Sequence, residues 1–361
     1  VLVAGCGKSG LGAPDSCRKR EPFPFCLMKM KAGWEGALRA GRLSKRHCAG
    51  TGKPSEGVAF RAFAGGFKPG ISIEEAFVST LEEADIPVWG EIELAWNYEK
   101  GKVLAITGTN GKTTTTTLVG EILKRYQDNT FVVGNIGTPY TQEVLKTDKD
   151  SVTVAEISSF QLETAVHFHP TVSAILNITP DHLNRHHTME NYAAVKESIT
   201  KNQTKDDFCV LNHEDSWLKA FAPKCPAQVI WFSSKEKLER GYYLVGSKIC
   251  RNLGNGEEVL MDVDKMQLIG VHNFENVMAA IAIAAAYGVP METILDTVKH
   301  FQAVEHRIEY VATKNGVVYY NDSKGTNPDA AIQAIRAMKW PTVLIGGGYD
   351  KQNTVTIGVG I

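Results

Sequence analysis

One short stretch constrains the fold of this chain more than any other. Residues 103–106 form an apolar run of the kind that makes a buried strand, and the segment "TGTNGKTTTTT" follows at once. Beyond the threonines, Leu118, Val119 and Ile122 recur at helical spacing. A strand, a glycine loop and a helix, in this order, are the context that a phosphate-binding loop requires. Glycines let backbone N–H groups approach an anion closely, and the helix N-terminus adds partial positive charge.

The spacing within the loop differs from the common pattern. GxxxxGK[ST] needs a glycine at Ile106, but the first glycine is Gly108, so the loop has the shorter form GxxGKT. Lys112 would reach the outer phosphates, and the Thr113 hydroxyl would bind a magnesium ion. A threonine-rich helix start with an exposed lysine is the alternative, and it explains the Gly-Lys-Thr order poorly. The sequence therefore predicts that ATP binds the following loop residues: Gly108, Thr109, Asn110, Gly111, Lys112, Thr113 and Thr114.

Strands and helices alternate from residue 102 to about residue 290. Residues 152–155 and 172–178 are nearly all apolar, as in parallel sheets that are buried on both faces. An alanine-rich helix is predicted over 273–287, where Gly288 and Pro290 end it. Two further strands, "GVVYYNDS" and "PTVLIGGG", are predicted on either side of a helix over 328–338. The pattern predicts an α/β fold of three units, of which the last is incomplete.

Composition indicates a soluble globular chain. Of its 361 residues, 43% are hydrophobic and 22% charged, and this length fits two or three domains. No apolar run approaches the roughly 20 residues of a membrane span, and no secretory signal opens the chain. Seven cysteines without metal-ligand spacing favour a reducing cytoplasm over a disulfide framework. We therefore expect a cytoplasmic protein without a membrane span. A monomer is a separate expectation, which the composition does not decide.

The net charge of −1 conceals an unusual stretch near the N-terminus. Residues 13–72 carry twelve Lys and Arg against four Asp and Glu, so the remainder is acidic. Residues 14–70 show neither a strand pattern nor a helical face, and we interpret them as translated in a shifted frame. Basic patches that bind nucleic acid usually belong to a recognisable fold, and none is evident here. We therefore expect no nucleic-acid partner.

Polar side chains follow the predicted strands of the central region. Glu156 ends one strand, and Asn177 ends another shortly before Asp181 and His182. Ligands of open parallel sheets bind beyond the carboxyl ends of the strands. A carboxylate and an imidazole beside a bound triphosphate suit magnesium coordination, although each residue alone is also an ordinary cap or loop residue.

Eight motifs in order resemble those of the Mur ligases. They are "ITGTNGKTT", "GNIGTP", "AEISSFQLE", "NITPDHLNRH", "NYAAVKESI", "GVHNFENVMAA", "EHRIE" and "NDSKGTNPDA", and the resemblance covers residues 73–351. "SSFQLE" and "DHLNRH" look most like the branch of this family that adds D-glutamate. The resemblance implies three domains: a Rossmann-like one at 1–97, a central ATP-binding domain with a parallel sheet at 98–300, and an incomplete Rossmann-like one at 301–361.

The resemblance also implies a reaction. An ATP-dependent ligase of this kind phosphorylates the carboxylate of UDP-N-acetylmuramoyl-L-alanine to an acyl phosphate. The amine of D-glutamate then attacks to form an amide, a step of peptidoglycan synthesis that supports cell shape and division. Two magnesium ions neutralise the crowded oxyanions.

Site residues follow from the same resemblance. Lys112, Glu156, His182 and Lys196 are implied in catalysis. Thr113 and Glu156 are implied to hold one magnesium ion. His182 and a carbamylated Lys196 are implied to hold the other; an exposed helix lysine is the alternative for Lys196. Residues implied to contact the nucleotide are Asn273, Asn276, Arg307 and Asp322; those implied to contact the substrates are Asn135, Lys324, Thr326 and Lys351.

Two departures from the family pattern qualify these expectations. Residues 14–70 lack the expected character, and the last domain lacks most of its sheet. We therefore expect the chain as given to fail as a ligase even if its central domain folds. The alternatives are a nucleotide-binding remnant without turnover, another Mur ligase, or a folylpolyglutamate-type ligase.

Overall fold

The computed structural model describes residues 87–347 except 303 and 305, three short strands before them, and the isolated positions 73, 74, 78 and 83. The chain divides into two compact units. The first comprises residues 1–102 and 131–169, and the second comprises 103–130 and 170–361. The predicted domain boundaries at residues 97 and 300 stay a prediction.

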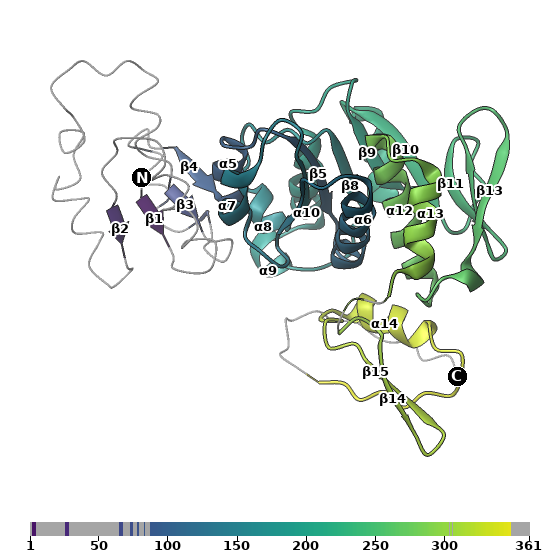
Figure 1. The fold of residues 1–361 in the computed structure, drawn as a ribbon. Coiled ribbons are helices and arrows are strands. Elements are labelled where there is room, and N and C mark those ends of the chain that lie inside the picture. The colour runs from purple at the N-terminus through teal and green to yellow at the C-terminus, as the bar shows by residue number, and fades with distance from the viewer. Residues whose placement is uncertain are drawn as a thin grey trace, which may run out of the picture. The chain divides into compact units, whose positions relative to one another are not determined.

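The first unit contains a small parallel sheet in the order β2-β1-β3-β4 (Figure 1). Its strands are β1 (Leu2–Ala4), β2 (Cys26–Met28), β3 (Gly65–Phe67) and β4 (Val88–Gly90). The unit also holds α5 (Glu91–Trp96), β6 (Thr130–Gly134), α7 (Tyr140–Glu143), β7 (Val152–Glu156) and α8 (Ser159–Leu162). Strands β6 and β7 are neighbours in their sheet. This arrangement confirms the α/β class of the first unit.

Part of the unusual stretch is ordered into this sheet. The prediction that residues 14–70 contain no strand is wrong for β2 and β3, which pair in parallel with β1. Three residues are too few for an alternating pattern, so a strand such as "CLM" leaves no periodic signal. The rest of 14–70, and most of the helix predicted after residue 73, lie outside the described residues.

A buried carboxylate anchors α5 within the first unit. The Glu93 side chain has no solvent exposure and accepts bonds from the backbone N–H groups of Val166 (2.8 Å), His167 (2.9 Å) and Phe168 (3.2 Å). His167 Nδ1 lies 2.8 Å from Glu93 Oε1. The carboxylate thus satisfies a loop that would otherwise bury unpaired amides.

The second unit is built on a larger sheet in the order β13-β12-β11-β10-β9-β8-β5. Pairing from β5 through β8, β9 and β10 to β11 is parallel, whereas β12 and β13 are antiparallel. The strands are β5 (Lys102–Thr107), β8 (Val172–Ile175), β9 (Phe208–Asn212), β10 (Gln228–Ser233), β11 (Gly241–Val245), β12 (Lys248–Asn252) and β13 (Glu257–Asp262). The predicted parallel central sheet is confirmed, although β8 ends earlier than expected.

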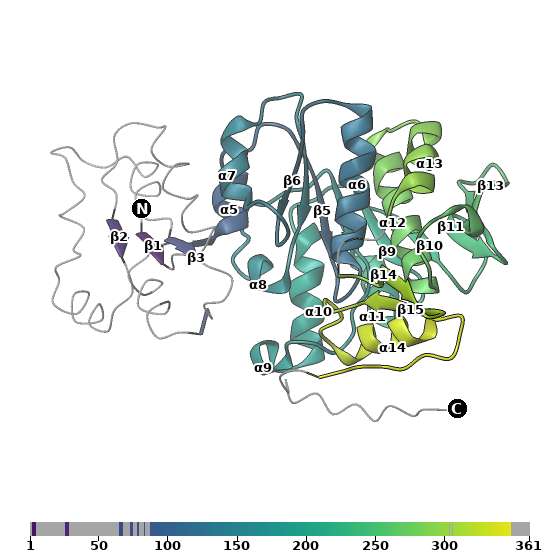
Figure 2. The ribbon, with the colours of Figure 1, turned by 60° about the horizontal axis from the view of Figure 1, so that its bottom comes forward.

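Helices cover this sheet. They are α6 (Lys112–Tyr126), α9 (Leu183–His186), α10 (Met189–Glu197), α11 (Ser216–Phe221), α12 (Val271–Tyr287) and α13 (Met291–His300). Helix α12 packs on α6, β8, β9 and β10, and α13 packs on α6 (Figure 2). The alanine-rich sequence of α12 allows this close packing, and Gly288 ends the helix in a left-handed conformation. The predicted helices at 112 and 273 are confirmed.

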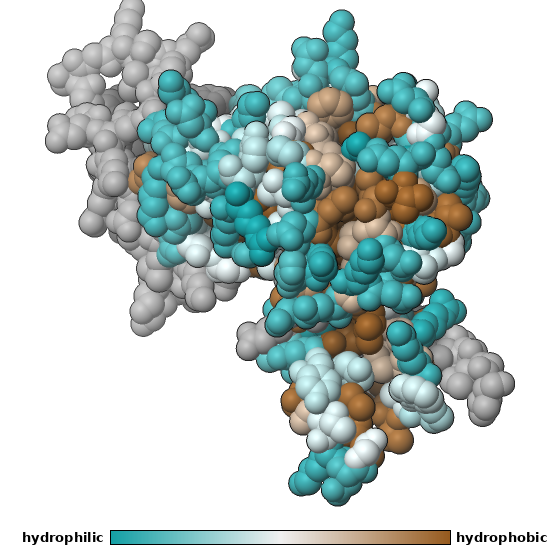
Figure 3. All heavy atoms as spheres, turned by 45° about the vertical axis from the view of Figure 1, so that its right-hand side comes forward, coloured by the Kyte–Doolittle hydropathy of each residue, from teal (hydrophilic) through white to brown (hydrophobic). Residues whose placement is uncertain are grey.

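The C-terminal segment contains a hairpin and a helix. Strands β14 (Glu309–Lys314) and β15 (Val317–Asn321) pair antiparallel, and α14 (Pro328–Arg336) follows. The strand predicted at "PTVLIGGG" is wrong: residues 341–347 have no regular structure, with Val343 90% and Ile345 94% exposed. In the described part of this segment, β14 and β15 pair only with each other, so residues 341–347 have no strand to which their backbone is hydrogen-bonded. Apolar side chains accordingly reach the surface over the segment (Figure 3).

Among the helices that the structure describes, none combines the length and the apolar content that a bilayer crossing demands.

The Glu93 anchor generates a stability prediction. Glu93→Ala leaves three amides without their buried acceptor, so we expect it to lower the free energy of unfolding by about 3 kcal/mol. Urea denaturation followed by tryptophan fluorescence measures the loss. Glu121→Ala is the matched control, because Glu121 makes an exposed pair with Lys124. Equal stability of the two variants would contradict the anchoring role.

Candidate active site

The loop between β5 and α6 depends on two glycines with left-handed backbone angles. Gly108 has φ of 144° and Gly111 has φ of 84°. A Cβ atom at Gly111 would collide with Asn276 Oδ1 on α12. Neither the angle nor the space admits a side chain, so glycine is required at this position.

Asn177, just beyond β8, holds the loop in shape. Its Oδ1 accepts from Asn110 N (2.8 Å), and its Nδ2 donates to Asn110 O (3.1 Å). Its own carbonyl accepts from Thr109 N (2.9 Å). The side-chain amide therefore pairs with the loop backbone as a neighbouring strand would, and it extends the β5–β8 ladder beyond the strands.

The side chain of Thr109 forms hydrogen bonds with other groups of the protein. Its hydroxyl lies 3.1 Å from the Tyr192 hydroxyl, donates to Thr179 O (3.1 Å) and accepts from Thr179 N (3.0 Å). The Thr109 side chain therefore positions the loop, and so do the amides of Thr109 and Asn110, which are bonded to Asn177. Helix α6 begins with Thr115 N bonded to Gly111 O, so the first-turn amides of Thr113 and Thr114 precede the helical ladder.

Two lysine ammonium groups meet at one carbonyl of the loop. Lys112 Nζ donates to Gly108 O (2.9 Å) and Thr109 O (2.8 Å). Lys196 Nζ donates to the same Gly108 O (2.8 Å) and lies 4.7 Å from the centre of the Tyr192 ring. Lys196 is only 1% exposed, so the alternative of an exposed helix lysine is wrong. Two cations beside a helix N-terminus form a strong attractor for anions.

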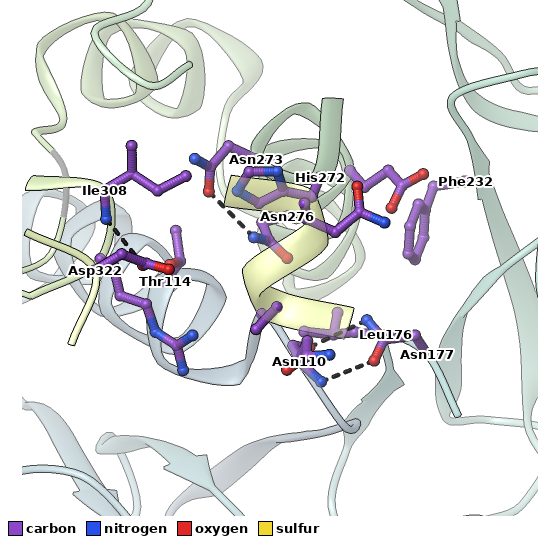
Figure 4. Close-up of a pocket in the computed structure, with 15 residues that line it drawn as sticks. Asn110, Thr114, Leu176, Asn177, Phe232, His272, Asn273, Asn276, Ile308 and Asp322 are labelled. Atoms are coloured by element: carbon purple, nitrogen blue, oxygen red, sulfur yellow. Dashed lines mark hydrogen bonds between the residues drawn. The ribbon is translucent and has the colours of Figure 1, made fainter. Parts of the chain in front are cut away.

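A cleft opens beside the loop, and its space, part of it open to solvent, is about 610 Å³ (Figure 4). The loop, the start of α12 and the C-terminal segment all contribute walls. The residues lining it are Asn110, Gly111, Thr114, Leu176, Asn177, Phe232, His272, Asn273, Glu275, Asn276, Arg307, Ile308, Asp322, Ala330 and Gln333.

The two asparagines of α12 point toward each other in the cleft wall (Figure 4). Asn276 Nδ2 donates to Asn273 Oδ1 (3.3 Å), and Asn273 Nδ2 donates to Ile269 O (2.7 Å). Gly270, not Asn273, is the N-cap of the helix. Asn273 is therefore no helix cap, and both side chains stand at the cleft beside Gly111.

The C-terminal segment contributes charged side chains and one residue with a strained backbone to the same cleft. Ile308 has φ of 44°, which is unusual for a β-branched residue, and its N–H donates to Asp322 Oδ1 (3.1 Å). Burial raises the pKa of Asp322. Burial, together with the nearby Arg307 guanidinium, lowers the pKa of His272 to about 4, so this ring is neutral at pH 7.

Glu156 and Asn135 lie together in the first unit. Asn135 Nδ2 donates to Glu156 Oε1 (2.7 Å), and Glu156 is 1% exposed. Its Oε2 is buried and has no hydrogen-bond partner among the described residues. An unpaired buried carboxylate oxygen is costly, and a cation would satisfy it.

The remaining predicted site residues lie in three different places. His182 has φ of 53°, and its Nε2 lies 3.6 Å from Asp181 Oδ2. Lys324 and Thr326 are exposed in the loop between β15 and α14. Lys351 lies outside the described residues.

Sequence reasoning missed part of this site. Asn177 was noted only as a strand end, and His272 was not singled out, although both lie within motifs that carry the resemblance. Asn327 and Asp329 were also missed, and both contact the loop through Asn110. In the described part of the chain no three His, Cys, Asp or Glu side chains form a metal cluster. Magnesium at a phosphate site commonly uses only one or two carboxylates with phosphates and water.

Known proteins with similar sequences belong to one family. A family profile described as "Mur ligase middle domain" matches residues 106–284. The UDP-N-acetylmuramoylalanine–D-glutamate ligase of Lachnospira eligens is 56% identical over 358 residues, which cover 97% of this chain and 78% of the relative. The ligase of the same name from Lachnoclostridium phytofermentans is 61% identical over 365 residues, with 98% and 78% covered.

Solved structures are similar in fold. The MurF ligase of Thermotoga maritima in complex with ADP has a TM-score of 0.53 and 20% identity, covering 76% of this chain and 65% of that one. MurF of Acinetobacter baumannii also has a TM-score of 0.53, with 21% identity and 67% and 55% covered. At this identity the likeness concerns the fold alone. Taken with the two close relatives, it shows that the chain belongs to the Mur ligase family, among the UDP-N-acetylmuramoylalanine–D-glutamate ligases.

Proposed function

We propose that this chain is an ATP-dependent ligase that joins D-glutamate to UDP-N-acetylmuramoyl-L-alanine in the cytoplasm, as a monomer. The observation that carries the proposal is the convergence of Lys112 and Lys196 on Gly108 O at the head of α6. Positive charge gathered at a helix N-terminus favours a bound triphosphate. The nucleoside would lie in the adjoining cleft, which the loop, α12 and the C-terminal segment line.

ATP would bind with its phosphates on the 108–114 loop and its nucleoside in the cleft. Binding of the outer phosphates would replace the bonds that Lys112 makes with the loop carbonyls. Asn273 and Asn276 would border the nucleotide from α12, and Arg307 and Asp322 from the C-terminal segment. Transfer of the terminal phosphoryl group to the alanine carboxylate gives an acyl phosphate and ADP. Attack by the glutamate amine on its carbonyl carbon then forms the amide and releases phosphate.

Magnesium fits the donors present. Glu156 has a buried, unpaired oxygen, and the Thr113 hydroxyl stands at the first turn of α6. We assign Glu156, Thr113, His182 and a carbamylated Lys196 as ligands of two ions. The ions would neutralise negative charge on the transferring phosphoryl group.

Carbamylation of Lys196 is supported by its surroundings. Lys196 is buried and Lys112 is half-buried, so the two ammonium groups that donate to Gly108 O repel each other more strongly than they would in water. Converting Lys196 to a carbamate removes that repulsion and supplies an anionic metal ligand. Tyr192 packs along the lysine and would hold it in place.

Substrate contacts are assigned to exposed or polar groups outside the cleft. Asn135 would approach the muramoyl substrate, and Lys324 and Thr326 would face it from the loop after β15. Lys351 would receive a carboxylate of D-glutamate. A nucleotide-binding protein without turnover is the alternative outcome of the assay below.

The function is tested by phosphate release from ATP with UDP-N-acetylmuramoyl-L-alanine, with and without D-glutamate. Release that depends on D-glutamate supports the ligase and would contradict the expectation from the sequence that the chain does not turn over, whereas ATP binding without such release would support the alternative. Lys112→Ala should weaken magnesium–ATP binding about 100-fold in calorimetry, because a charge-assisted phosphate contact is lost. Lys124→Ala on the same helix, an exposed residue paired with Glu121, should bind ATP as the parent does.

Carbamylation has its own test. Lys196→Ala should lose nearly all activity, and short carboxylic acids such as acetate should restore part of it by supplying the missing carboxylate. The control is Lys201→Ala, a residue beyond the end of α10 that should behave as the parent does. Full activity of Lys196→Ala without added acid would refute the role.

A further inference from the structure

The side chain of Asn110 joins the phosphate loop to the C-terminal segment. Asn110 Nδ2 donates to Asp329 Oδ2 (2.8 Å), and Asn110 Oδ1 accepts from Asn327 Nδ2 (2.9 Å). Asn110 stands more than 200 positions away from these partners in sequence. Its backbone is fixed by Asn177, so the amide is held on both sides.

Asn110, Asn327 and Asp329 form a hydrogen-bonded cluster, and each bond in this cluster fixes the direction of the next. The Asp329 carboxylate can only accept, so it must face Asn110 Nδ2. Asn110 Oδ1 is then left to accept from Asn327 Nδ2. Asn327 Oδ1 in turn accepts from Ala330 N (2.8 Å) and caps α14. With Asn327 only 8% exposed, a reversed amide would place two oxygens against each other in a buried position.

The cluster controls which parts of the C-terminal segment face the cleft. Helix α14 supplies Ala330 and Gln333 to the cleft wall. The loop that carries Lys324 and Thr326 is bounded by Asp322 at the cleft and by Asn327 at the cluster. Loss of the cluster would free both the helix and this loop from the phosphate loop.

We propose that Asn327 and Asp329 are positioning residues that hold the C-terminal segment against the phosphate loop through Asn110, and so complete the nucleotide cleft. The assignment rests on the proposed function, because the cleft is taken to bind ATP. Neither residue needs to touch ATP. The strained Ile308 lies between α13 and β14, directly before the first strand of the C-terminal segment, and the cluster would hold this strained connection in place.

The pattern of donors and acceptors permits a swap experiment. Asn327→Asp keeps the helix cap, since Asp and Asn cap equally well, but sets an acceptor against Asn110 Oδ1. Adding Asp329→Asn supplies a donor on the other side. Rotation of the Asn110 amide by half a turn then makes both bonds again, with the two partners exchanged. The double variant has the net charge of the parent.

We expect Asn327→Asp to weaken magnesium–ATP binding in the full chain roughly tenfold, the equivalent of one or two hydrogen bonds. The double variant Asn327→Asp with Asp329→Asn should return to within about threefold of the parent. The same cycle in an Asn110→Ala background measures the direct repulsion between the two carboxylates that Asn327→Asp brings together. The rescue should be smaller there, because only the relief of that repulsion remains and no amide is left to rotate.

Amide exchange in α14 provides a readout that does not need ATP. Asn327→Asp should speed exchange over residues 328–336, and the double variant should restore the parent rate. If the parent binds ATP but the double variant is no better than Asn327→Asp in either readout, the positioning role is wrong. Rescue of the same size in the Asn110→Ala background would also overturn it. If exchange follows the swap but the parent does not bind ATP, the proposed function fails while the cluster stands.

Discussion

The pairing of the Asn177 side chain with the Asn110 backbone is the constraint on which the site depends. The backbone of a loop beyond the end of a strand has no neighbouring strand to bond it. The side-chain amide of Asn177 bonds the Asn110 backbone as a peptide group of a neighbouring strand would. Because β5 and β8 are parallel neighbours, the loop and Asn177 emerge at the same edge. Thr109 adds a second attachment through Tyr192. The loop is therefore built by the sheet before any ligand arrives.

The fixed position of the loop explains how the half-buried Lys112 and the buried Lys196 can lie side by side. Gly108 O is held in place, and both Lys112 and Lys196 donate to it. The energetic cost of gathering like charges is offset when an anion binds, so the arrangement favours the ligand-bound state. His272 stays neutral because burial and the neighbouring guanidinium lower its pKa to about 4. His272 therefore adds no positive charge to the cleft, whose lining includes the Arg307 guanidinium.

Local patterns predicted the parts of this structure that short-range chemistry determines. The strand, loop and helix around Lys112 were evident because glycine, lysine and apolar spacing each have a direct structural meaning. The three-residue strand β2 was not evident, because it forms by pairing with β1 and such pairing leaves no periodic pattern in the sequence. The burial of Lys196 followed only from family resemblance. The bonds of Asn110 to Asn327 and Asp329 depend on tertiary contact, which a single sequence does not reveal.

The central claim is that three separate segments form one nucleotide cleft. Amide hydrogen exchange of the full chain, with and without magnesium and ADP, tests this claim most directly. The account predicts slower exchange in residues 108–114, at the start of α12, and in residues 307–333 at the same nucleotide concentration. Protection confined to the loop, with the C-terminal segment unchanged, would contradict it.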